Sequence, residues 1–560
     1  MIQRPGMPKG QPFLRNLLWV LPAAFLVGFF LIPLGNILGV MAKSDGILSV
    51  TGVLQPLWFT LWQAVLSTLL TLLLGLPAAF VFARYQFAGK EFLRLLTTLP
   101  FILPTVVVAA GFTALLGPRG LVNEGLMRLF QLQSPPIDFM NTLGAILTAH
   151  VFYNTSVVIR VVGSALSQLD PRMEDAGKVL GGKPWRVFKE ITLPLLRPSI
   201  AVAGLMVFLF DFTSFGVILL LGGPRFSTLE VSIYTQTLSM LNLRMAGLLS
   251  FIQLAFTFGV TLLYSRLNRR RSVPLMPRLK GEGVHRVQTR REKFGVGLIV
   301  TLLILLLVTP LVAMLLRSVL QPQTGGQIGS TFSLAFYREL FINRNNAFFY
   351  VPPIDAALNS LIFAGVTVLF SVGLGLPISY ALVHQRGLKR WLDPLIMLPL
   401  GTSAVTLGLG FLITFNRPPF DSGSFPLLIP LAHSLVAMPF VVRTVQPALA
   451  SIPQSLRDSA ASLGASPLRV FREVEAPIIR RAAMVGMIFS FTISLGEFGA
   501  TSFLARPDTP TLPVAIYRFL SQPGTMNYGQ AMAMASLLMI VCAAAIGLLD
   551  RMQLMGQAEI

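Results

Sequence analysis

Two acidic residues stand inside long apolar stretches of the 560-residue chain. Asp211 lies in the segment FLFDFTSFG, and Glu497 lies in FTISLGEFG. An ionised side chain in mid-membrane costs roughly 2.5 to 3.5 kcal/mol on insertion scales, so such residues usually serve a function. Hydroxyl groups accompany both acids, at Thr213, Ser214 and Ser494. We interpret the five residues as lining a pathway that favours a cationic solute; the alternative is that each acid makes a satisfied hydrogen bond between helices.

A short match to a phosphate-binding loop is a second candidate for chemistry. Residues Gly177 to Lys183 fit the pattern G-x-x-x-x-G-K, but Pro184 stands where a Ser or Thr hydroxyl would bind Mg²⁺. No β-strand pattern precedes the match, so we predict no nucleotide site there. The one cysteine, Cys542, lies in an apolar run, which excludes an intrachain disulfide and argues against a thiol-bound metal. The sequence therefore predicts neither catalytic residues nor a metal site.

The same polar segment carries a stronger pattern, because it occurs twice. Residues 173–194 read MEDAGKVLGGKPWRVFKEITLP, and residues 456–477 read LRDSAASLGASPLRVFREVEAP. Small or apolar residues at helical spacing predict a first helix in each copy. A glycine then predicts its end, and a closing proline predicts the end of a second helix. The glycines are Gly181 in the first copy and Gly464 in the second, and the closing prolines are Pro194 and Pro477.

The alignment continues on both sides of this segment, which shows an internal duplication. Phe215 and Gly216, for example, align with Phe498 and Gly499. Two histidines also occupy equivalent places near the start of a predicted span, His150 and His433. A paired metal or proton role is conceivable for them. We favour a packing role, because a duplication preserves packing residues as well.

The composition is that of a protein with many membrane spans. Hydrophobic residues make up 54% of the chain and charged residues 12%, and the mean hydropathy is +0.72. The net charge is +21, but the basic residues cluster between apolar runs, as in membrane proteins, so we do not expect nucleic-acid binding. The predicted spans lie at about 17–41, 59–83, 93–116, 143–166, 199–222, 245–265, 295–319, 357–383, 391–415, 426–448, 480–504 and 529–549.

Six spans in each half return the chain to its starting side, so both halves have the same orientation. We predict a cytoplasmic tail, a first repeat, a basic cytoplasmic linker, a second repeat and a cytoplasmic tail, at 1–16, 17–265, 266–293, 294–550 and 551–560. The linker serves as a topology anchor in this interpretation, with binding of anionic lipid as the alternative. The predicted fold class is an all-α polytopic membrane protein with about 12 transmembrane helices in two parallel six-helix repeats.

The duplicated segment resembles the EAA loop of permease subunits in binding-protein-dependent ABC importers. Asp175 and Asp458 stand where that family usually has Glu. Because Asp is shorter, any ion pair to an ATPase must form at closer range. By this resemblance, the residues that couple the chain to an ATPase are Asp175, Ala176, Gly177, Gly181, Pro194, Asp458, Ser459, Ala460, Gly464 and Pro477.

This resemblance covers nearly the whole chain. Fused permeases with two EAA loops look like the ferric-iron and thiamine branch of the family, and residues 222–234 and 509–517 are similar to that branch. It implies a translocation pathway for a small cationic solute, ferric iron or thiamine, in a prokaryotic inner membrane. It also implies two partners: an extracytoplasmic solute-binding protein, and an ATP-binding subunit present in two copies.

By the same resemblance the chain is not an enzyme and binds no cofactor itself, because ATP is used by the partner ATPase. Its other contacts are the solute and the lipid bilayer. The main alternative is an ion- or proton-coupled secondary transporter, which also uses parallel repeats and buried acids. Such a transporter would not need duplicated coupling loops, and it would work without an ATPase.

Overall fold

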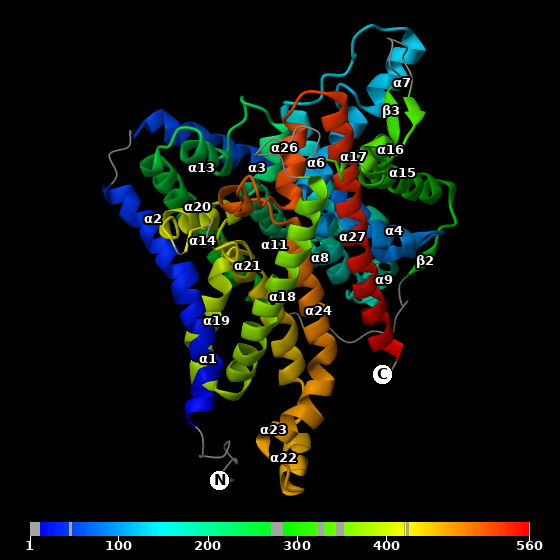
Figure 1. Cartoon of the computed structure of the whole chain (residues 1–560). Helices are drawn as coiled ribbons and strands as arrows, with labels where there is room; N and C mark the ends of the chain where they lie inside the picture. Colours follow the sequence, from blue (N-terminus) through cyan, green and yellow to red (C-terminus); the bar gives the residue numbers. More distant parts are fainter. Residues whose placement is uncertain are drawn as a thin grey trace.

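The protein is built of long helices packed side by side, with a pair of short helices, α22 and α23, at one extreme end (Figure 1). The computed structural model describes residues 12–43, 48–269, 284–322, 330–342, 352–418, 420–421 and 425–558. Most of the tail predicted at 1–16 and the middle of the linker predicted at 266–293 lie outside these residues.

In the first half, three helices exceed twenty residues, and the elements that follow one another differ widely in length. They are α1 (Pro12–Leu26), η1 (Val27–Leu31), α2 (Ile32–Lys43), α3 (Val50–Arg84), α4 (Lys90–Leu96), α5 (Leu99–Ile102), α6 (Thr105–Leu116), α7 (Leu121–Phe130), α8 (Leu143–Ser167), α9 (Pro171–Val179), α10 (Pro184–Val187), η2 (Phe188–Thr192), α11 (Leu193–Phe212), α12 (Gly216–Leu221), α13 (Leu229–Leu238) and α14 (Leu243–Arg269).

The second half repeats this order of long and short helices. Its elements are α15 (Arg290–Leu307), α16 (Thr309–Val319), α17 (Ala335–Glu339), α18 (Pro353–His384), α19 (Arg386–Met397), η3 (Leu398–Gly401), α20 (Ala404–Thr414), α21 (Leu428–Ala450), α22 (Gln454–Ser462), α23 (Pro467–Val470), η4 (Phe471–Glu475), α24 (Ala476–Gly496), α25 (Thr501–Leu504), α26 (Leu512–Leu520) and α27 (Thr525–Ala558).

Strands are short in the described residues and form two pairs. β1 (Tyr85–Gln86) lies parallel to β2 (His285–Arg286), and β3 (Leu320–Pro322) lies antiparallel to β4 (Ser330–Phe332). The first pair places the end of the predicted linker beside the junction of the second and third spans. The charge pattern predicts the same side of the membrane for both segments.

The predicted fold class is confirmed. Within the described residues, eleven helices are long and apolar enough to cross a membrane. A twelfth candidate is a pair of helices, Leu392–Gly401 and Ala404–Thr414, bent by 100°. The two halves therefore supply matching sets of spans, as the duplication predicts.

The third spans, predicted as single helices at 93–116 and 391–415, are both broken. In the first half, Leu103 and Pro104 have extended backbone between α5 and α6, because a proline disfavours helical backbone in the residue before it. In the second half, the Ser403 side chain accepts hydrogen bonds from the amides of Val405 and Thr406 and begins α20.

The fifth spans also differ from the prediction at 199–222 and 480–504. They run from Pro184 to Phe212 and from Pro467 to Gly496. The predicted stops at Pro194 and Pro477 are therefore wrong. Each of these prolines follows a π turn, η2 or η4, whose wider hydrogen-bonded ring lets the helix continue past a residue without an N–H.

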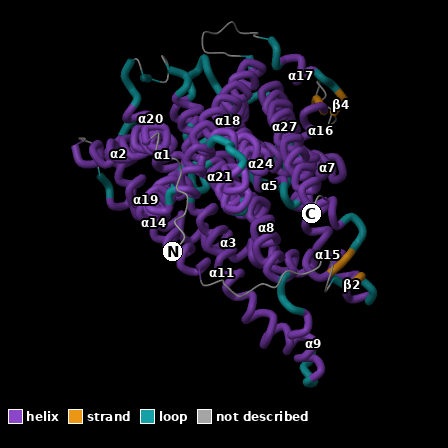
Figure 2. The backbone as a smooth tube through the Cα atoms, turned by 90° about the horizontal axis from the view of Figure 1, so that it is seen from below, coloured by secondary structure: helices purple, strands orange, loops and turns teal. Residues whose placement is uncertain are grey.

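The first span of each half packs against the other half. The segment α1–α2 contacts α18 and α20, whereas α15 contacts α3 and α16 contacts α6. Seen from below, α1–α2 and α15–α16 lie on opposite sides of the bundle (Figure 2). The two halves are therefore interlocked rather than merely adjacent.

Matched glycines permit this crossing. A Cβ on Gly111 in α6 would lie 3.1 Å from the backbone oxygen of Pro310, and one on Gly410 in α20 would lie 3.0 Å from Cβ of Pro33. Both distances are shorter than ordinary van der Waals contact. The close approach of the interlocked spans thus depends on the absence of a side chain at two equivalent positions.

We predict that G111L and G410L each lower the free energy of unfolding by about 1 to 3 kcal/mol, the usual cost of overpacking. Chemical denaturation of the purified chain in detergent would measure the change. The matched control is G365L in α18, where an added Cβ meets nothing within 4 Å. Equal effects at all three positions would show that the crossing is not tightly packed.

Candidate functional site

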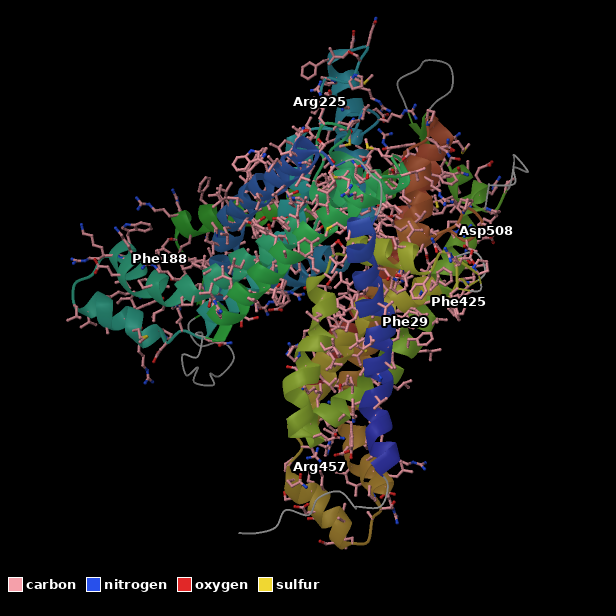
Figure 3. The ribbon with its side chains drawn as sticks, turned by 90° about the vertical axis from the view of Figure 1, so that its left-hand side faces the viewer. Phe29, Phe188, Arg225, Phe425, Arg457 and Asp508 are labelled. Atoms are coloured by element: carbon pink, nitrogen blue, oxygen red, sulfur yellow. The ribbon has the colours of Figure 1, made fainter. Side chains whose placement is uncertain are left out.

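Two helical arms, each built from one copy of the duplicated segment, diverge from the bundle. Figure 3 shows Phe188 on one arm and Arg457 on the other, far apart. The first arm comprises α9, α10 and η2, and the second comprises α22, α23 and η4. Both leave the bundle at the ends of α8 and α21, which are equivalent spans.

The turn in each arm is the same Schellman motif. Gly181 has φ +82° and Gly464 has φ +83°, a conformation that favours glycine. The amide of Gly182 bonds to the carbonyl of Gly177 at 3.0 Å, and that of Ala465 to Ala460 at 3.1 Å. The predicted glycine corner is therefore confirmed in both copies.

The tips of the arms carry large apolar side chains that are mostly exposed. Leu180 is 87% exposed and Trp185 is 72% exposed on the first arm, while Leu463 is 89% exposed and Leu468 is 76% exposed on the second. Clusters of exposed apolar side chains at the end of a projecting element are typical of a protein-binding surface. Equivalent tips on both arms indicate two similar contacts.

The two aspartates predicted to couple to an ATPase lie on the exposed arms. Asp175 accepts a hydrogen bond from Lys178 Nζ at 2.9 Å, which holds the pKa of its carboxyl below its ordinary value. Asp458 accepts one from Gln454 Nε2 at 3.0 Å. Both of these hydrogen bonds lie within the arms themselves.

The root of the first arm depends on the neighbouring residue, Glu174, which the sequence reasoning missed. Its carboxylate forms an ion pair with Arg84, at the end of α3, and accepts a hydrogen bond from Thr192 Oγ1 at 2.9 Å. Arg84 is buried. This pair fixes the arm to the end of the second span.

The root of the second arm also holds an ion pair, but this pair lies within the arm, and the residue at the place of Glu174 has the opposite charge. Arg457, the equivalent of Glu174, donates through Nε to Glu475 Oε1 at 2.6 Å, and Glu475 is the equivalent of Thr192. His384 is the last residue of α18, as Arg84 is the last residue of α3, and its Nε2 lies 3.6 Å from the same oxygen. In the aligned segments, Arg457 stands in the place of Glu174, and Glu475 stands in the place of Thr192. These two linked exchanges were the sequence signal for the ion pair between Arg457 and Glu475.

We predict that R84A lowers the free energy of arm opening by about 2 kcal/mol, because it leaves the half-buried Glu174 carboxylate unpaired. Hydrogen exchange of the amides in α9 would measure this. R186A is the matched control on the same arm, since its pair with Glu190 is solvent-exposed and worth at most about 0.5 kcal/mol. Similar exchange rates in the two variants would contradict the role given to Arg84.

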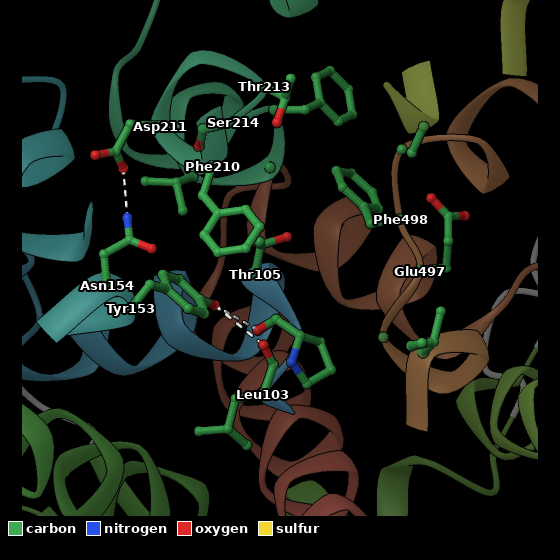
Figure 4. A pocket seen from close by; sticks show the side chains of 18 of the residues that line it. Leu103, Thr105, Tyr153, Asn154, Phe210, Asp211, Thr213, Ser214, Glu497 and Phe498 are labelled. Atoms are coloured by element: carbon green, nitrogen blue, oxygen red, sulfur yellow. Dashed lines mark hydrogen bonds between the residues drawn. The ribbon is translucent and has the colours of Figure 1, made fainter. Parts of the chain in front are cut away.

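A cavity of about 420 Å³ lies between the halves, at the ends of α11 and α24 (Figure 4). Its size is within the range of about 300 to 1,000 Å³ for small-molecule sites. Four of the five predicted pathway residues line it: Asp211, Thr213, Ser214 and Glu497. Ser494 is not among the lining residues. The acids, predicted in mid-span, lie instead where their helices end.

Asp211 is buried in the last turn of α11, and partners from two other helices hold it. Asn154 Nδ2 donates to its Oδ1 at 2.7 Å, and His150 Nδ1 lies 3.4 Å from the same oxygen. Gln63 Nε2 donates to the Asp211 backbone carbonyl at 3.0 Å. In the described part of the chain, Asp211 Oδ2 has no hydrogen-bond partner.

Glu497 has a different environment, because both of its oxygens bind the protein. Oε1 accepts from the Ala500 amide at 2.8 Å, and Oε2 accepts from the Thr501 amide at 2.9 Å and its hydroxyl at 2.6 Å. His433 Nε2 lies 3.2 Å from Oε2. The carboxylate thus accepts the hydrogen bonds of the first turn of α25. Its contacts match the alternative interpretation of the acids, in which the side chain makes satisfied hydrogen bonds within the protein.

The two histidines occupy equivalent places in these networks. His150 Nδ1 bonds to Ser67 Oγ at 2.9 Å, and its Nε2 bonds to Ser214 Oγ at 2.9 Å. His433 Nδ1 bonds to Ser494 Oγ at 2.8 Å. Position 211 aligns with 494 and position 214 with 497. At these two places beside the histidine, the first half has Asp and then Ser, and the second half has Ser and then Glu.

An aromatic cluster from matched positions joins the halves beside the cavity. Phe215 and Phe498 stack at 5.5 Å between centroids, and these rings contact Tyr234 at 5.3 Å and Tyr517 at 5.5 Å respectively. Both phenylalanines line the cavity. Because α11 and α24 run from the arms towards these residues, the stack lies at the end of the cavity remote from the arms.

A further buried acid, Glu230 in α13, was not singled out from the sequence. Its Oε2 accepts from Ser403 Oγ at 2.6 Å, and its Oε1 accepts from Gln253. Ser403 is the residue that caps α20, so this contact joins the broken third span of one half to the other half. A lone Glu in the apolar stretch STLEVSIY was the available signal.

Two parallel helical repeats with a cavity between them and a matched arm on each define a membrane permease. The family described as "Binding-protein-dependent transport system inner membrane component" matches residues 71–273 and 371–553. The chain belongs to this family and carries its domain twice, as do fused ABC importer permeases of the thiamine and iron branch. It is therefore a multi-pass inner-membrane protein.

Relatives with similar length support this assignment. The thiamine transport system permease protein ThiP of Brucella abortus (strain 2308) is 27% identical over 501 residues, 88% of this chain and 86% of the relative. That of Haemophilus influenzae is 24% identical and covers 86% of each chain. A crystal structure of a bacterial ABC transporter that imports alginate is similar over 46% of this chain and 96% of its own, with 18% identity and a TM-score of 0.38.

Proposed function

We propose that the chain forms the translocation pathway of an importer for a small cationic solute, thiamine or ferric iron. An extracytoplasmic binding protein delivers the solute, and an ATP-binding subunit docks on each arm. The chain itself hydrolyses no ATP and binds no cofactor. Its repeats occupy 17–265 and 294–550, and both termini, like the arms, face the cytoplasm.

The observation that carries this proposal is the pair of matched arms. Each has the same glycine turn, an exposed apolar tip and a buried ion pair at its root. An isolated bundle gains nothing from holding leucine side chains in solvent, whereas a docked partner would bury them. Two equivalent tips correspond to two copies of one partner.

The helices that leave the arms support a coupling mechanism. A continuous helical segment joins the turn at Lys183 to Asp211, and a second joins Ser466 to Glu497. Movement of an arm by its ATPase therefore reaches the residues that line the cavity without passing through a flexible loop. In this mechanism, ATP binding and hydrolysis change which side of the cavity is open.

We predict that L180E together with L463E abolishes binding of the ATP-binding subunit and reduces solute-stimulated ATP hydrolysis in proteoliposomes by at least about tenfold, because charges replace the apolar contacts. Both side chains are almost fully exposed in the chain alone, so the substitutions do not disturb its own packing. Copurification and phosphate release are the measurements.

The matched control is L129E, at a leucine that is 73% exposed on α7, away from the arms. Its binding of the ATP-binding subunit should equal that of the unmodified chain. Normal ATPase binding by the double variant would refute the docking proposal. Solute flux that continues without any ATPase would instead identify a secondary transporter.

A further inference from the structure

Two equivalent contacts join the halves near the stack of Phe215 on Phe498. One is the contact of α13, in the first half, with α20, in the second, and the other is the contact of α26, in the second half, with α6, in the first (Figure 1). The duplication makes them equivalent, because α13 aligns with α26 and α20 aligns with α6. The two contacts nevertheless use different kinds of residue.

The contact of α13 with α20 is polar and buried. Glu230 accepts a hydrogen bond from Ser403 Oγ at 2.6 Å through Oε2, and one from Gln253 through Oε1. The hydroxyl oxygen of Ser403 also accepts from the amides of Val405 and Thr406, so the network ends in the first turn of α20. Separation of α13 from α20 would leave a buried carboxylate oxygen without its partner, which is costly.

An aromatic contact reinforces the same side. Tyr234, one helical turn after Glu230 on α13, packs edge-on against Phe503 of α25, with 5.6 Å between the ring centroids. α25 in turn packs closely on α20, since a Cβ on Gly408 would lie 2.8 Å from Cα of Ala500. α13 of the first half is therefore joined to two packed helices of the second half.

The contact of α26 with α6 lacks these groups. The duplication aligns Glu230 with Pro513, Ser403 with Pro104, and Phe503 with Leu220. A proline side chain can neither donate nor accept a hydrogen bond, and a leucine side chain presents no ring. Parting of α26 from α6 therefore costs no side-chain hydrogen bond at the two places where the other contact has Glu230 and Ser403.

We propose that α13 and α20 form a fixed contact about which the halves turn, and that the cavity opens between α26 and α6. Phe215 and Phe498 come from different halves, so any opening towards their end of the cavity must separate the two rings. The movement that loses fewest hydrogen bonds keeps Glu230 on Ser403. Glu230 is outside the cavity lining, so it acts as a positioning residue.

The inference rests on the proposed function only in taking the cavity to open towards one side at a time. It does not depend on which solute is carried. It adds that the two halves of this permease separate unequally although their helices are paired by duplication. The physical reason is that a buried acid and its hydroxyl partner stand at one contact, and two prolines stand at the other.

The test is the measurement of distances between pairs of spin labels, by pulsed electron paramagnetic resonance, on the full-length chain in lipid nanodiscs. C542A removes the one cysteine, so labels attach only at introduced sites. S239C with R417C reports on the ends of α13 and α20, and the aligned pair, Q522C with P118C, reports on the ends of α26 and α6. All four labelled positions are exposed.

In the chain alone, the distance distribution across α26 and α6 should be at least about twice as wide as that across α13 and α20, because a contact with fewer hydrogen bonds opens more readily. E230A should widen the distribution across α13 and α20 by about twofold, since it removes the acceptor of Ser403 and Gln253. S403A should widen it in the same direction, while Glu230 keeps its bond from Gln253.

T237V is the matched control, because Thr237 is buried on the same helix but bonds within that helix, to the carbonyl of Ile233. Its two distributions should equal those of the labelled parent chain, and thermal unfolding would show that each variant is folded. Equal widths for the two pairs in the parent chain would overturn the inference. So would an unchanged distribution across α13 and α20 in both E230A and S403A.

Addition of the ATP-binding subunit and ATP separates this inference from the proposed function. A change of mean distance confined to the pair across α26 and α6 would support both. A change of similar size in both pairs would support the importer and reject the fixed contact. The expected widths in the chain alone, with no change on addition of ATP, would support the fixed contact and reject the importer.

Discussion

A backbone amide or carbonyl that leaves a helix inside a membrane must find another partner, because the surrounding hydrocarbon provides none. In this protein the breaks in the third and fifth spans lie at one place, around the cavity between the halves. There the side chains of Ser403 and Glu497 accept the hydrogen bonds of the amides that begin α20 and α25. The cavity therefore exists where polar side chains permit the helices to stop.

Duplication supplied two similar halves, but the polar contacts within them have diverged while their positions have been kept. At the roots of the arms, the acid is Glu174 in one half and Glu475 in the other. In the cavity, the acid is Asp211 in one half and Glu497 in the other. Each exchange preserves an ion pair or a hydrogen bond, so both halves stay folded, yet each acid meets different neighbours.

The arms and the cavity are mechanically connected. The π turns η2 and η4 let helical structure continue past Pro194 and Pro477, so each arm is the start of a membrane span rather than a loop attached to it. The interlocking of the first spans limits how the halves separate, since α6 crosses α16 and α20 crosses α2. Rotation of one half against the other is easier to accommodate in such an arrangement than complete separation.

The sequence by itself determined the number of spans, the duplication, the glycine turns and the proximity of Asp211 to hydroxyl groups, because all of these depend on local periodicity and spacing. The tertiary structure decided where the spans break, and which acid has a carboxylate oxygen without a hydrogen-bond partner among the described residues. Those outcomes depend on partners distant in the chain: Asn154 for Asp211, His433 for Glu497 and Arg84 for Glu174. Hydrophobic periodicity sets which face of a helix is buried, whereas the packing of several helices sets which polar atoms meet.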